Sequence, residues 1–341
     1  MNDTTSIVGV DIAKQVFQIH TVDLASGEIV RVQFKRAKFL AWFVNRPPCV
    51  IGMEACGGAH HWARELIALG HTVKLLPAQK VRPFAVGNKN DMADAQAIWM
   101  AMQQPGVKTV AVKTQAQQAV LAMHRMRTQL VKFRTAQSNA LRGLLTEYGE
   151  VMPKGRGALN RAIPEVLGRL ADQLPTVLIE TLREQFARLG EIDTHVLDIE
   201  RRLLAWLKEE RACQTLADIP GVGLLTATAV VATMGDPRAF KSGREFAAWL
   251  GLVPRQVGTG GRVKLLGISK RGDTYVRMLL IHGARSVLTH SKAPPAWATP
   301  LLQRRPLNVV VVALANKMAR TMWALLAHQR TYQPGHVSTP V

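Results

Sequence analysis

The order of short β-rich and helical segments in the first hundred residues constrains the fold of this chain most. Three runs rich in Val, Ile and aromatic residues come first, and helical and β-rich segments then alternate. The three runs are Ile7 to Val10, Val16 to Val22 and Ile29 to Phe34, with a turn at Ala25 to Glu28. The later segments are a helix Lys38 to Val44, a strand Cys49 to Met53, a helix His60 to Leu69, a strand Thr72 to Leu76 and a helix from about Asn90. The pattern predicts an α/β domain that opens with an antiparallel three-stranded sheet.

Four acidic residues stand at the ends of these segments, whose order matches the ribonuclease H-like topology. Asp11 closes the first strand, Glu54 closes the fourth, and Asp91 and Asp94 lie three residues apart on one helix face. Four carboxylates at one point repel one another unless cations neutralise them, and hard oxygen ligands suit Mg²⁺ or Mn²⁺. The sequence therefore predicts a divalent-metal site of the kind that cleaves phosphodiesters by a two-metal route.

Each of these acids also has an ordinary structural interpretation. Asp11 could belong to a turn, Glu54 to a surface and Asp91 to a helix N-cap, where Asp is favoured. A second alternative is a phosphate loop of the actin and sugar-kinase type, which needs a Gly and a Thr or Ser just after the Asp. Ile12 and Ala13 follow Asp11 instead. The joint placement of four acids favours the metal site over these alternatives.

The charge balance points to a polyanion as the partner. The 341 residues carry a formal net charge of +20. Because 48% of the residues are hydrophobic and only 20% are charged, the chain is expected to fold and not to be disordered throughout. From residue 236 to the end there are 16 Lys and Arg against 3 acids, and residues 95–146 contain 7 Lys or Arg and no acid. Residues 160–211 mix both signs, as a solvated helix pair does. Nucleic acid is the expected partner of the basic parts.

The cysteines and the apolar segments set the expected compartment. Cys49, Cys56 and Cys213 have no metal-ligand spacing, so neither a disulfide framework nor a zinc site is predicted. The N-terminus lacks a signal-peptide pattern, and polar residues interrupt the apolar segment Leu307 to Leu326, which predicts an amphipathic helix. We expect a soluble, cytoplasmic protein without a membrane span.

Long helical patterns fill the middle of the chain and shorter ones the end. Thr114 to Tyr148 and Pro175 to Glu210 predict two long helices that form an antiparallel coiled-coil spacer. Helices Leu224 to Met234, Ser242 to Leu250, Thr274 to Leu288 and Val309 to Ala327 are expected beyond them. The predicted domains are 1–112 (catalytic), 113–211 (spacer), 212–330 (basic, mainly helical) and 331–341 (tail).

Two glycine motifs in the basic part are candidates for contact with nucleic acid. Gly221 and Gly223, after Pro220, resemble the turn of a helix-hairpin-helix motif, whose backbone N–H groups approach a phosphate; an ordinary interhelix turn is the alternative. The second motif places Thr259 between glycines on a loop, where its hydroxyl could attack a phosphate. The basic residues around it, candidate phosphate contacts, are Arg255, Arg262, Lys264, Lys270 and Arg271. A solvated basic turn is the alternative here.

Several stretches together resemble the DEDD transposases of bacterial insertion sequences, the group that includes Piv-type DNA invertases and bridge-RNA-guided recombinases. The stretches are GVDIAK, GMEACGG, NKNDMADAQAI, DIPGVGLLTATAVVATMGD, FAAWLGLVPRQ and LLGISKRGDTYVRMLLIHGAR. The resemblance covers nearly the whole chain. It implies a RuvC-like N-terminal domain holding the four acids, a coiled-coil spacer and a C-terminal domain that supplies a serine nucleophile.

The resemblance also implies the reaction and its partners. The expected protein cuts and rejoins DNA with Mg²⁺ (or Mn²⁺), is guided by an RNA from the element, and works as a dimer or tetramer. The acid-free stretch Thr114 to Thr146 is a candidate RNA-facing surface, although phosphate contacts do not distinguish RNA from DNA.

This chain departs from its relatives at the expected nucleophile. Where they usually read Ser-Ser-Gly-Gly after Pro-Arg-Gln, it reads Gly258-Thr259-Gly260-Gly261. Thr259 is therefore the predicted nucleophile, and Ser269 is the alternative hydroxyl. Two other classes stay open: a RuvC-like junction endonuclease that uses water as nucleophile, and an inactive nucleic-acid binder.

Overall fold

The computed structural model describes residues 6–23, 26–85, 90–292 and 294–334. By its internal contacts the chain divides into two compact units. The α/β unit comprises residues 1–115 and 234–241, and the helical unit comprises residues 116–233 and 242–341. Ala25 of the predicted turn and residues 335–341 of the predicted tail lie outside the described residues. The rest of the turn is present, because the Gly27 N–H donates to the Asp23 carbonyl at 2.8 Å and Gly27 has φ of 74°. The finer division into three domains and a tail stays a prediction.

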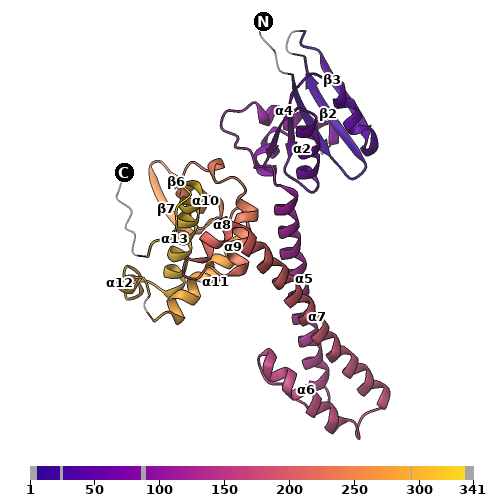
Figure 1. The fold of residues 1–341 in the computed structure, drawn as a ribbon, viewed down its shortest axis with the longest axis vertical. Coiled ribbons are helices and arrows are strands. Elements are labelled where there is room, and N and C mark those ends of the chain that lie inside the picture. Colours follow the sequence, from indigo (N-terminus) through magenta and orange to yellow (C-terminus); the bar gives the residue numbers. More distant parts are fainter. Residues whose placement is uncertain (1–5, 24–25, 86–89, 293, 335–341) are drawn as a thin grey trace. The chain divides into compact units, whose positions relative to one another are not determined.

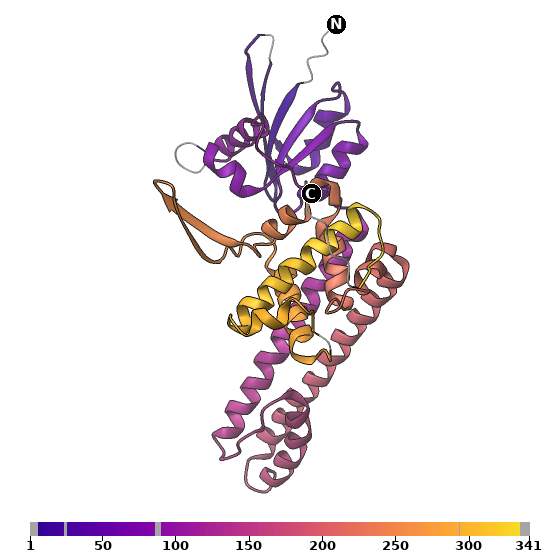
Figure 2. The same ribbon diagram turned by 90° about the vertical axis from the view of Figure 1, so that its left-hand side faces the viewer.

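The α/β unit is built on a five-stranded mixed sheet (Figures 1 and 2). Its strands are β1 (Ile7–Ile12), β2 (Val16–Val22), β3 (Ile29–Lys35), β4 (Val50–Glu54) and β5 (Thr72–Leu76). They lie in the order β3-β2-β1-β4-β5. The pairs β1–β2 and β2–β3 are antiparallel, whereas β1–β4 and β4–β5 are parallel. The predicted antiparallel opening is thus present, and the sheet is consistent with a DEDD nuclease-like domain.

Helices cover both faces of this sheet. On one face, α1 (Phe39–Val44) and α2 (Ala59–Ala68) complete a core with Val8, Val10 and Phe17 of the sheet. On the other face lies α4 (Asp91–Met102), whose Ala97, Ile98, Ala101 and Met102 are buried. The short helices η1 (Arg36–Lys38), α3 (Ala78–Val81) and η2 (Arg82–Phe84) lie in the connections, and η3 (Pro237–Ala239) also belongs to this unit.

Two glycines allow α4 to lie directly on the sheet. A Cβ atom on Gly9 of β1 would collide with the Ala95 carbonyl and lie 2.8 Å from Trp99 Cβ, and one on Gly52 of β4 would lie 2.6 Å from Met102 Sδ. Gly9 and Gly52 are paired across the parallel strands. Because side chains alternate along a strand, Asp11 and Glu54, two residues further on, point to the same face as α4.

The helical unit contains the two expected long helices, α5 (Gln115–Thr146) and α7 (Thr176–Glu209). Arg127 of α5 contacts Glu200 of α7 at 2.7 Å, and Arg134 contacts Asp193 at 3.0 Å. Residue numbers rise along α5 as those of their partners fall along α7, so the helices are antiparallel, as predicted.

A helix that the sequence analysis did not predict packs where these two helices are joined. It is α6 (Arg156–Leu170). Its buried Leu159, Ile163 and Leu167 form a cluster with Leu141 and Leu145 of α5 and Leu182 of α7. This cluster forms the hydrophobic core where α6 packs against the ends of α5 and α7 (Figure 1).

The remaining helices of this unit are α8 (Arg211–Ala217), α9 (Leu224–Met234), α10 (Gly243–Trp249), α11 (Thr274–His290), α12 (Ala298–Leu302) and α13 (Leu307–Ala327). Helix α13 packs against α10 and α11 and buries Val310, Leu314 and Met318. Among the described residues it is the one helix long and apolar enough to cross a membrane, a test that core helices also pass. Its buried face agrees with the expected amphipathic helix.

A buried histidine joins α5 to two of these helices. His124 is 2% exposed, and its ring nitrogens lie 3.0 Å from the Thr228 hydroxyl of α9 and 3.0 Å from the Tyr275 hydroxyl of α11. The Thr228 hydroxyl donates to the Leu224 carbonyl at 2.7 Å, so it accepts from Nε2–H, and Nδ1 accepts from Tyr275. Burial, followed by the charge of Arg127, lowers the pKa of His124 to about 4. The ring is therefore neutral in this network.

The segment expected to be a glycine-rich loop is a β-hairpin. Strands β6 (Pro254–Thr259) and β7 (Arg262–Ile268) pair antiparallel, and the hairpin extends away from the helices of its unit (Figure 2). Gly260 and Gly261 form its two-residue turn with φ of 55° and 77°, as a type I′ turn requires. The loop prediction was wrong because a Gly-Gly pair between two extended runs is itself a hairpin signal.

Candidate active site

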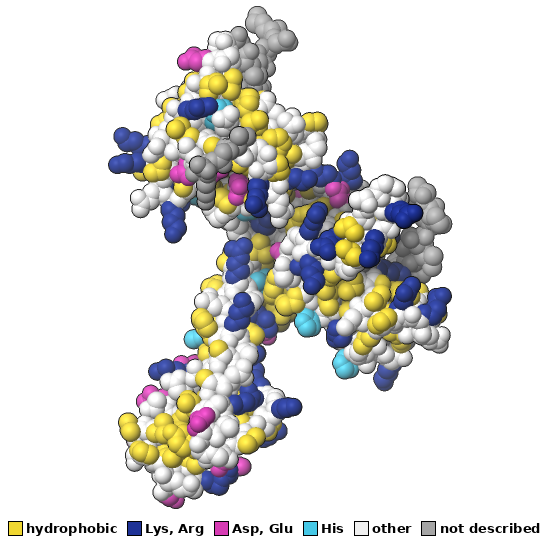
Figure 3. Space-filling model, turned by 180° about the vertical axis from the view of Figure 1, so that it is seen from behind, with side chains coloured by type: hydrophobic (Ala, Val, Ile, Leu, Met, Phe, Trp, Pro, Cys, Tyr) yellow, Lys and Arg dark blue, Asp and Glu magenta, His cyan; other side chains and the backbone are white. Residues whose placement is uncertain are grey.

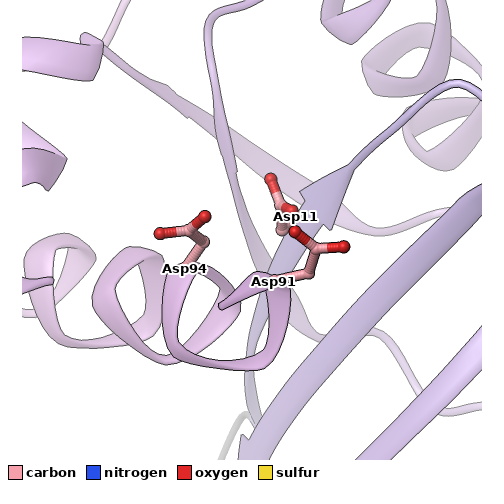
Figure 4. A group of neighbouring side chains, drawn as sticks. All are labelled: Asp11, Asp91 and Asp94. Atoms are coloured by element: carbon pink, nitrogen blue, oxygen red, sulfur yellow. The ribbon is translucent and has the colours of Figure 1, made fainter. Parts of the chain in front are cut away.

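Three of the four predicted acids come together at the end of the sheet (Figure 4). Asp11 lies on β1, one residue after Val10, which pairs with Met53 of β4. Asp91 and Asp94 belong to the first turn of α4. One carboxylate oxygen from each lies within 4.8 Å of the other two. The Asn90 side chain caps α4 by accepting from the Met92 N–H at 3.0 Å, so Asp91 and Asp94 do not serve as the cap. Their side chains remain turned toward Asp11.

Glu54 lies close to this cluster but outside it. It ends β4 beside β1, one residue beyond the Val10–Met53 pair. Both Glu54 and Asp11 act on Cys56: burial raises the pKa of the thiol first, and the two carboxylates raise it further. Cys56 is therefore a neutral thiol near both acids. The described geometry brings Asp11, Asp91 and Asp94 together and leaves Glu54 as a neighbour.

Two glycines that were not among the predicted site residues create this geometry. Gly9 and Gly52 each stand two residues before an acid, in Gly-Val-Asp and Gly-Met-Glu. Their missing side chains admit α4 against the sheet, and this contact brings Asp91 and Asp94 to Asp11. The repeated spacing of a glycine two residues before an acid at a strand end was the available signal.

Thr259 lies in the β6–β7 hairpin, next to the turn. It pairs with Arg262, and Val257 pairs with Lys264. Directly opposite residues point to one face of a hairpin, so the Thr259 hydroxyl shares its face with Arg262 and Lys264. All residues of β6 are exposed. The hydroxyl and two of the predicted phosphate contacts are thus accessible on one face.

The other predicted phosphate contacts and the alternative hydroxyl have different surroundings. Arg255 is exposed on β6, whereas Lys270 and Arg271 follow β7 in a backbone segment packed against Gly251. The buried guanidinium of Arg277 donates to the Arg271 carbonyl and fixes this segment. The Ser269 hydroxyl oxygen is enclosed, with less than 1 Å² of exposed area and no hydrogen-bond partner among the described residues. This enclosure makes Ser269 less accessible than Thr259.

The glycines of the predicted helix-hairpin-helix turn differ from each other. Gly221 has φ of 83°, and a Cβ there would lie 2.7 Å from the Gly283 carbonyl oxygen of α11. A close approach of two backbones therefore explains glycine at this position. A Cβ on Gly223 meets nothing within 4 Å. Contact of either residue with nucleic acid stays a prediction.

The basic charge of the helical unit is partly neutralised. Lys and Arg side chains are spread over the visible face of the unit, and acidic side chains gather toward the end with α6 (Figure 3). On α5, the acid-free stretch, Arg127 and Arg134 are paired with Glu200 and Asp193. Two of the five cations in the stretch Thr114 to Thr146, which is predicted to face RNA, therefore form ion pairs with α7.

A mixed sheet with an acidic cluster at its strand ends is consistent with a DEDD nuclease-like enzyme that acts on nucleic acid. Comparison with known families makes the class specific. Residues 213–298 match the transposase IS116/IS110/IS902 family, and residues 8–150 match the transposase domain named for the DEDD acids and IS110.

Similar proteins span nearly the same length as this chain. A probable family 20 transposase of Pseudomonas aeruginosa is 48% identical over 97% of this chain and 99% of its own. The transposase for insertion sequence element IS1111A of Coxiella burnetii is 42% identical, over 96% and 92% of the two chains. The transposase for insertion sequence element IS1328 of Yersinia enterocolitica is 38% identical, over 94% and 96%. The chain belongs to the IS110 family of transposases and is a DNA transposase.

Proposed function

We propose that this transposase cuts and rejoins DNA with a divalent metal at Asp11, Asp91 and Asp94 and with the Thr259 hydroxyl as a covalent nucleophile. The observation that carries the proposal is the convergence of three carboxylates from β1 and α4 within 4.8 Å. Such a group repels itself strongly, and a bound cation relieves the repulsion.

The donor set fits Mg²⁺ or Mn²⁺. All three side chains offer carboxylate oxygens, the ligands that these hard cations prefer, and Glu54 adds a fourth carboxylate beside them. A bound ion would polarise the scissile phosphate and stabilise the leaving oxygen. The protein's part is to hold the carboxylates in place through the contact of α4 with Gly9 and Gly52.

Thr259 would form the covalent intermediate. Its hydroxyl oxygen attacks phosphorus and loses its proton, one P–O bond forms to the threonine, and the P–O bond within the strand breaks. The released strand oxygen takes up a proton, so the step balances. The reverse attack by a second strand's hydroxyl rejoins DNA and frees Thr259. Arg262 and Lys264, on the same hairpin face, would stabilise the charge on the phosphate oxygens.

The proposal extends to partners that the family resemblance implies. A guide RNA would select the DNA sites, with the exposed cations of α5, within the stretch Thr114 to Thr146, as its binding surface. A dimer or tetramer would supply the acids and the hydroxyl needed for paired cuts. The reaction would take place on chromosomal DNA in the bacterial cytoplasm.

One experiment separates this proposal from its two rivals. End-labelled junction DNA is incubated with the protein and Mg²⁺ and then resolved under denaturing conditions. A labelled protein–DNA adduct supports the covalent recombinase. Free cut ends without an adduct would instead support a junction endonuclease that uses water, and intact DNA would support a nucleic-acid binder.

A further inference from the structure

The sheet carries a row of polar side chains that continues from the acidic cluster to its edge. Asp11 on β1 lies opposite Gln18 on β2, and Gln18 lies opposite Gln33 on β3. Cross-strand partners point to the same face, so all three share the face that carries α4. Gln18 is 9% exposed, and its side-chain amide donates to the Gln33 amide oxygen at 3.2 Å. A pair of neutral amides therefore stands beside the candidate metal site.

Strand β3 extends this row into an exposed polar face. Its residues alternate between exposed and half-buried, and Arg31, Gln33 and Lys35 are exposed. Arg31 pairs with His20, which packs against Trp99 of α4, and the Arg31 guanidinium donates to the Gln96 side chain at 3.3 Å. These contacts place the exposed residues of β3 on the face with α4. Two cations, about 13 Å apart along the strand, thus flank an amide.

We infer that Arg31, Gln33 and Lys35, with Gln33 held in place by the buried Gln18, bind the sugar-phosphate backbone of the DNA strand that is delivered to Asp11. The inference rests on the proposed metal site. Arg31 and Lys35 supply the charge that attracts phosphates at the edge of the sheet. Closer to the carboxylates the face carries amide side chains instead of cations. A neutral amide donor can contact a phosphate oxygen without competing with a metal ion for Asp11.

The test compares Arg31→Ala/Lys35→Ala with a matched control, Lys208→Ala/Arg211→Ala, which removes two exposed cations at the junction of α7 and α8. Binding of a fluorescent 30-base DNA strand, its duplex and an RNA of the same sequence is measured in EDTA over a range of salt concentrations. The β3 variant is expected to flatten the dependence of log affinity on log salt for DNA by about two units relative to the control. Equal slopes for the two variants would overturn the inference, as would a loss confined to RNA.

A second variant tests the amide and its position. Gln33 is exposed, so Gln33→Leu keeps the size of the side chain and removes its hydrogen bonds without opening the core. We expect cleavage to slow about ten-fold or more while the salt slope stays unchanged, because a misplaced strand reacts slowly even when it binds. Cleavage at the original rate would overturn the role of the amide.

The binding and cleavage readouts also separate this inference from the metal-site proposal. DNA binding in EDTA does not require a bound metal. If Asp11→Asn left cleavage intact while the β3 variant lost DNA binding, the metal proposal would fail and the DNA-binding face would stand.

Discussion

The acidic cluster and the Thr259 hairpin position reactive groups in opposite ways. Asp91 and Asp94 are held by a helix packed on glycines of a buried sheet, so the cluster is fixed by the core of its unit. Thr259 is held by the pairing of two exposed strands and a Gly-Gly turn. A packed site tolerates little displacement, whereas an exposed hairpin can move as one piece. The comparison favours a rigid setting for the proposed metal site and a less constrained one for the proposed nucleophile.

The largest effect on formation of the covalent protein–DNA adduct is expected from substitution of Thr259 in the hairpin. Thr259→Ala should lose the covalent adduct completely, because alanine has no oxygen to bond phosphorus. Thr259→Ser should keep the adduct and raise its rate about five- to thirty-fold, since relief of roughly 1 to 2 kcal/mol of crowding by the methyl group has that effect. Denaturing gels of labelled DNA report both results. An adduct that persists in Thr259→Ala would refute this nucleophile and leave Ser269 or water.

The next largest effect is expected at the acidic cluster. Asp11→Asn should slow cleavage by about a hundred- to a thousand-fold, because it removes one metal ligand. DNA affinity should remain close to that of the original protein, since the basic surfaces are unchanged. Asp91→Asn and Asp94→Asn should behave alike, and Glu54→Gln shows whether the neighbouring acid is also a ligand. Normal turnover in Asp11→Asn, measured with the same DNA, would exclude the metal site.

The buried His124 gives the helical unit a pH dependence of its own. Its pKa is about 4 in the folded chain, below the ordinary value of 6.5, so the unfolded chain binds the proton first as pH falls. The free energy of unfolding therefore falls progressively as the pH is lowered from 6.5 to 4, by up to about 3 kcal/mol. Urea unfolding from pH 7 to pH 4 measures this loss. His124→Gln should flatten the dependence, and an equally steep curve in that variant would assign it to other groups.

The rigidity of the acidic cluster can be tested at Gly9, the glycine beneath α4. Gly9→Ala should destabilise the α/β unit by about 1 to 3 kcal/mol, because the added methyl overlaps Ala95 and Trp99. Gly261→Ala in the hairpin turn meets open space and should alter only the turn, where φ is 77°. Thermal unfolding compares the two variants. Equal, small losses would contradict the difference between packed and exposed sites.

A smaller effect is expected from the cations beside Thr259. Arg262→Ala/Lys264→Ala should flatten the dependence of log affinity on log salt by roughly one to two units, since each phosphate contact contributes about one. Fluorescence anisotropy with duplex DNA measures the slope. An affinity that does not change with salt would rule out phosphate contact by this face.

The residues that the sequence analysis predicted correctly follow local rules. Strands β1 to β5 show β-rich runs bounded by polar residues, and Asn90 is a recognisable cap, so the sheet and the start of α4 could be placed. Helix α6 was missed because Pro164 and Gly168 weaken its local preference, whereas burial of Ile163 and Leu167 stabilises it. Tertiary packing therefore determines that residues 156–170 are helical.

Two features of the molecule depend on contacts between residues far apart in the sequence and were therefore not predicted. The approach of α4 to the sheet depends on Gly9 and Gly52, which are far from Asp91 along the chain. The pairing of Arg127 with Glu200 joins residues on separate helices. Charge counting along the sequence therefore overstated the free charge of α5.

The most direct test of the central claim is Mn²⁺ binding followed by electron paramagnetic resonance. The original protein should bind Mn²⁺ in a titration of the free ion signal, and Asp11→Asn/Asp91→Asn should lose that binding while retaining its folded circular-dichroism spectrum. Unchanged Mn²⁺ binding in the double variant, or DNA cleavage that continues in excess EDTA, would contradict a metal site at Asp11, Asp91 and Asp94.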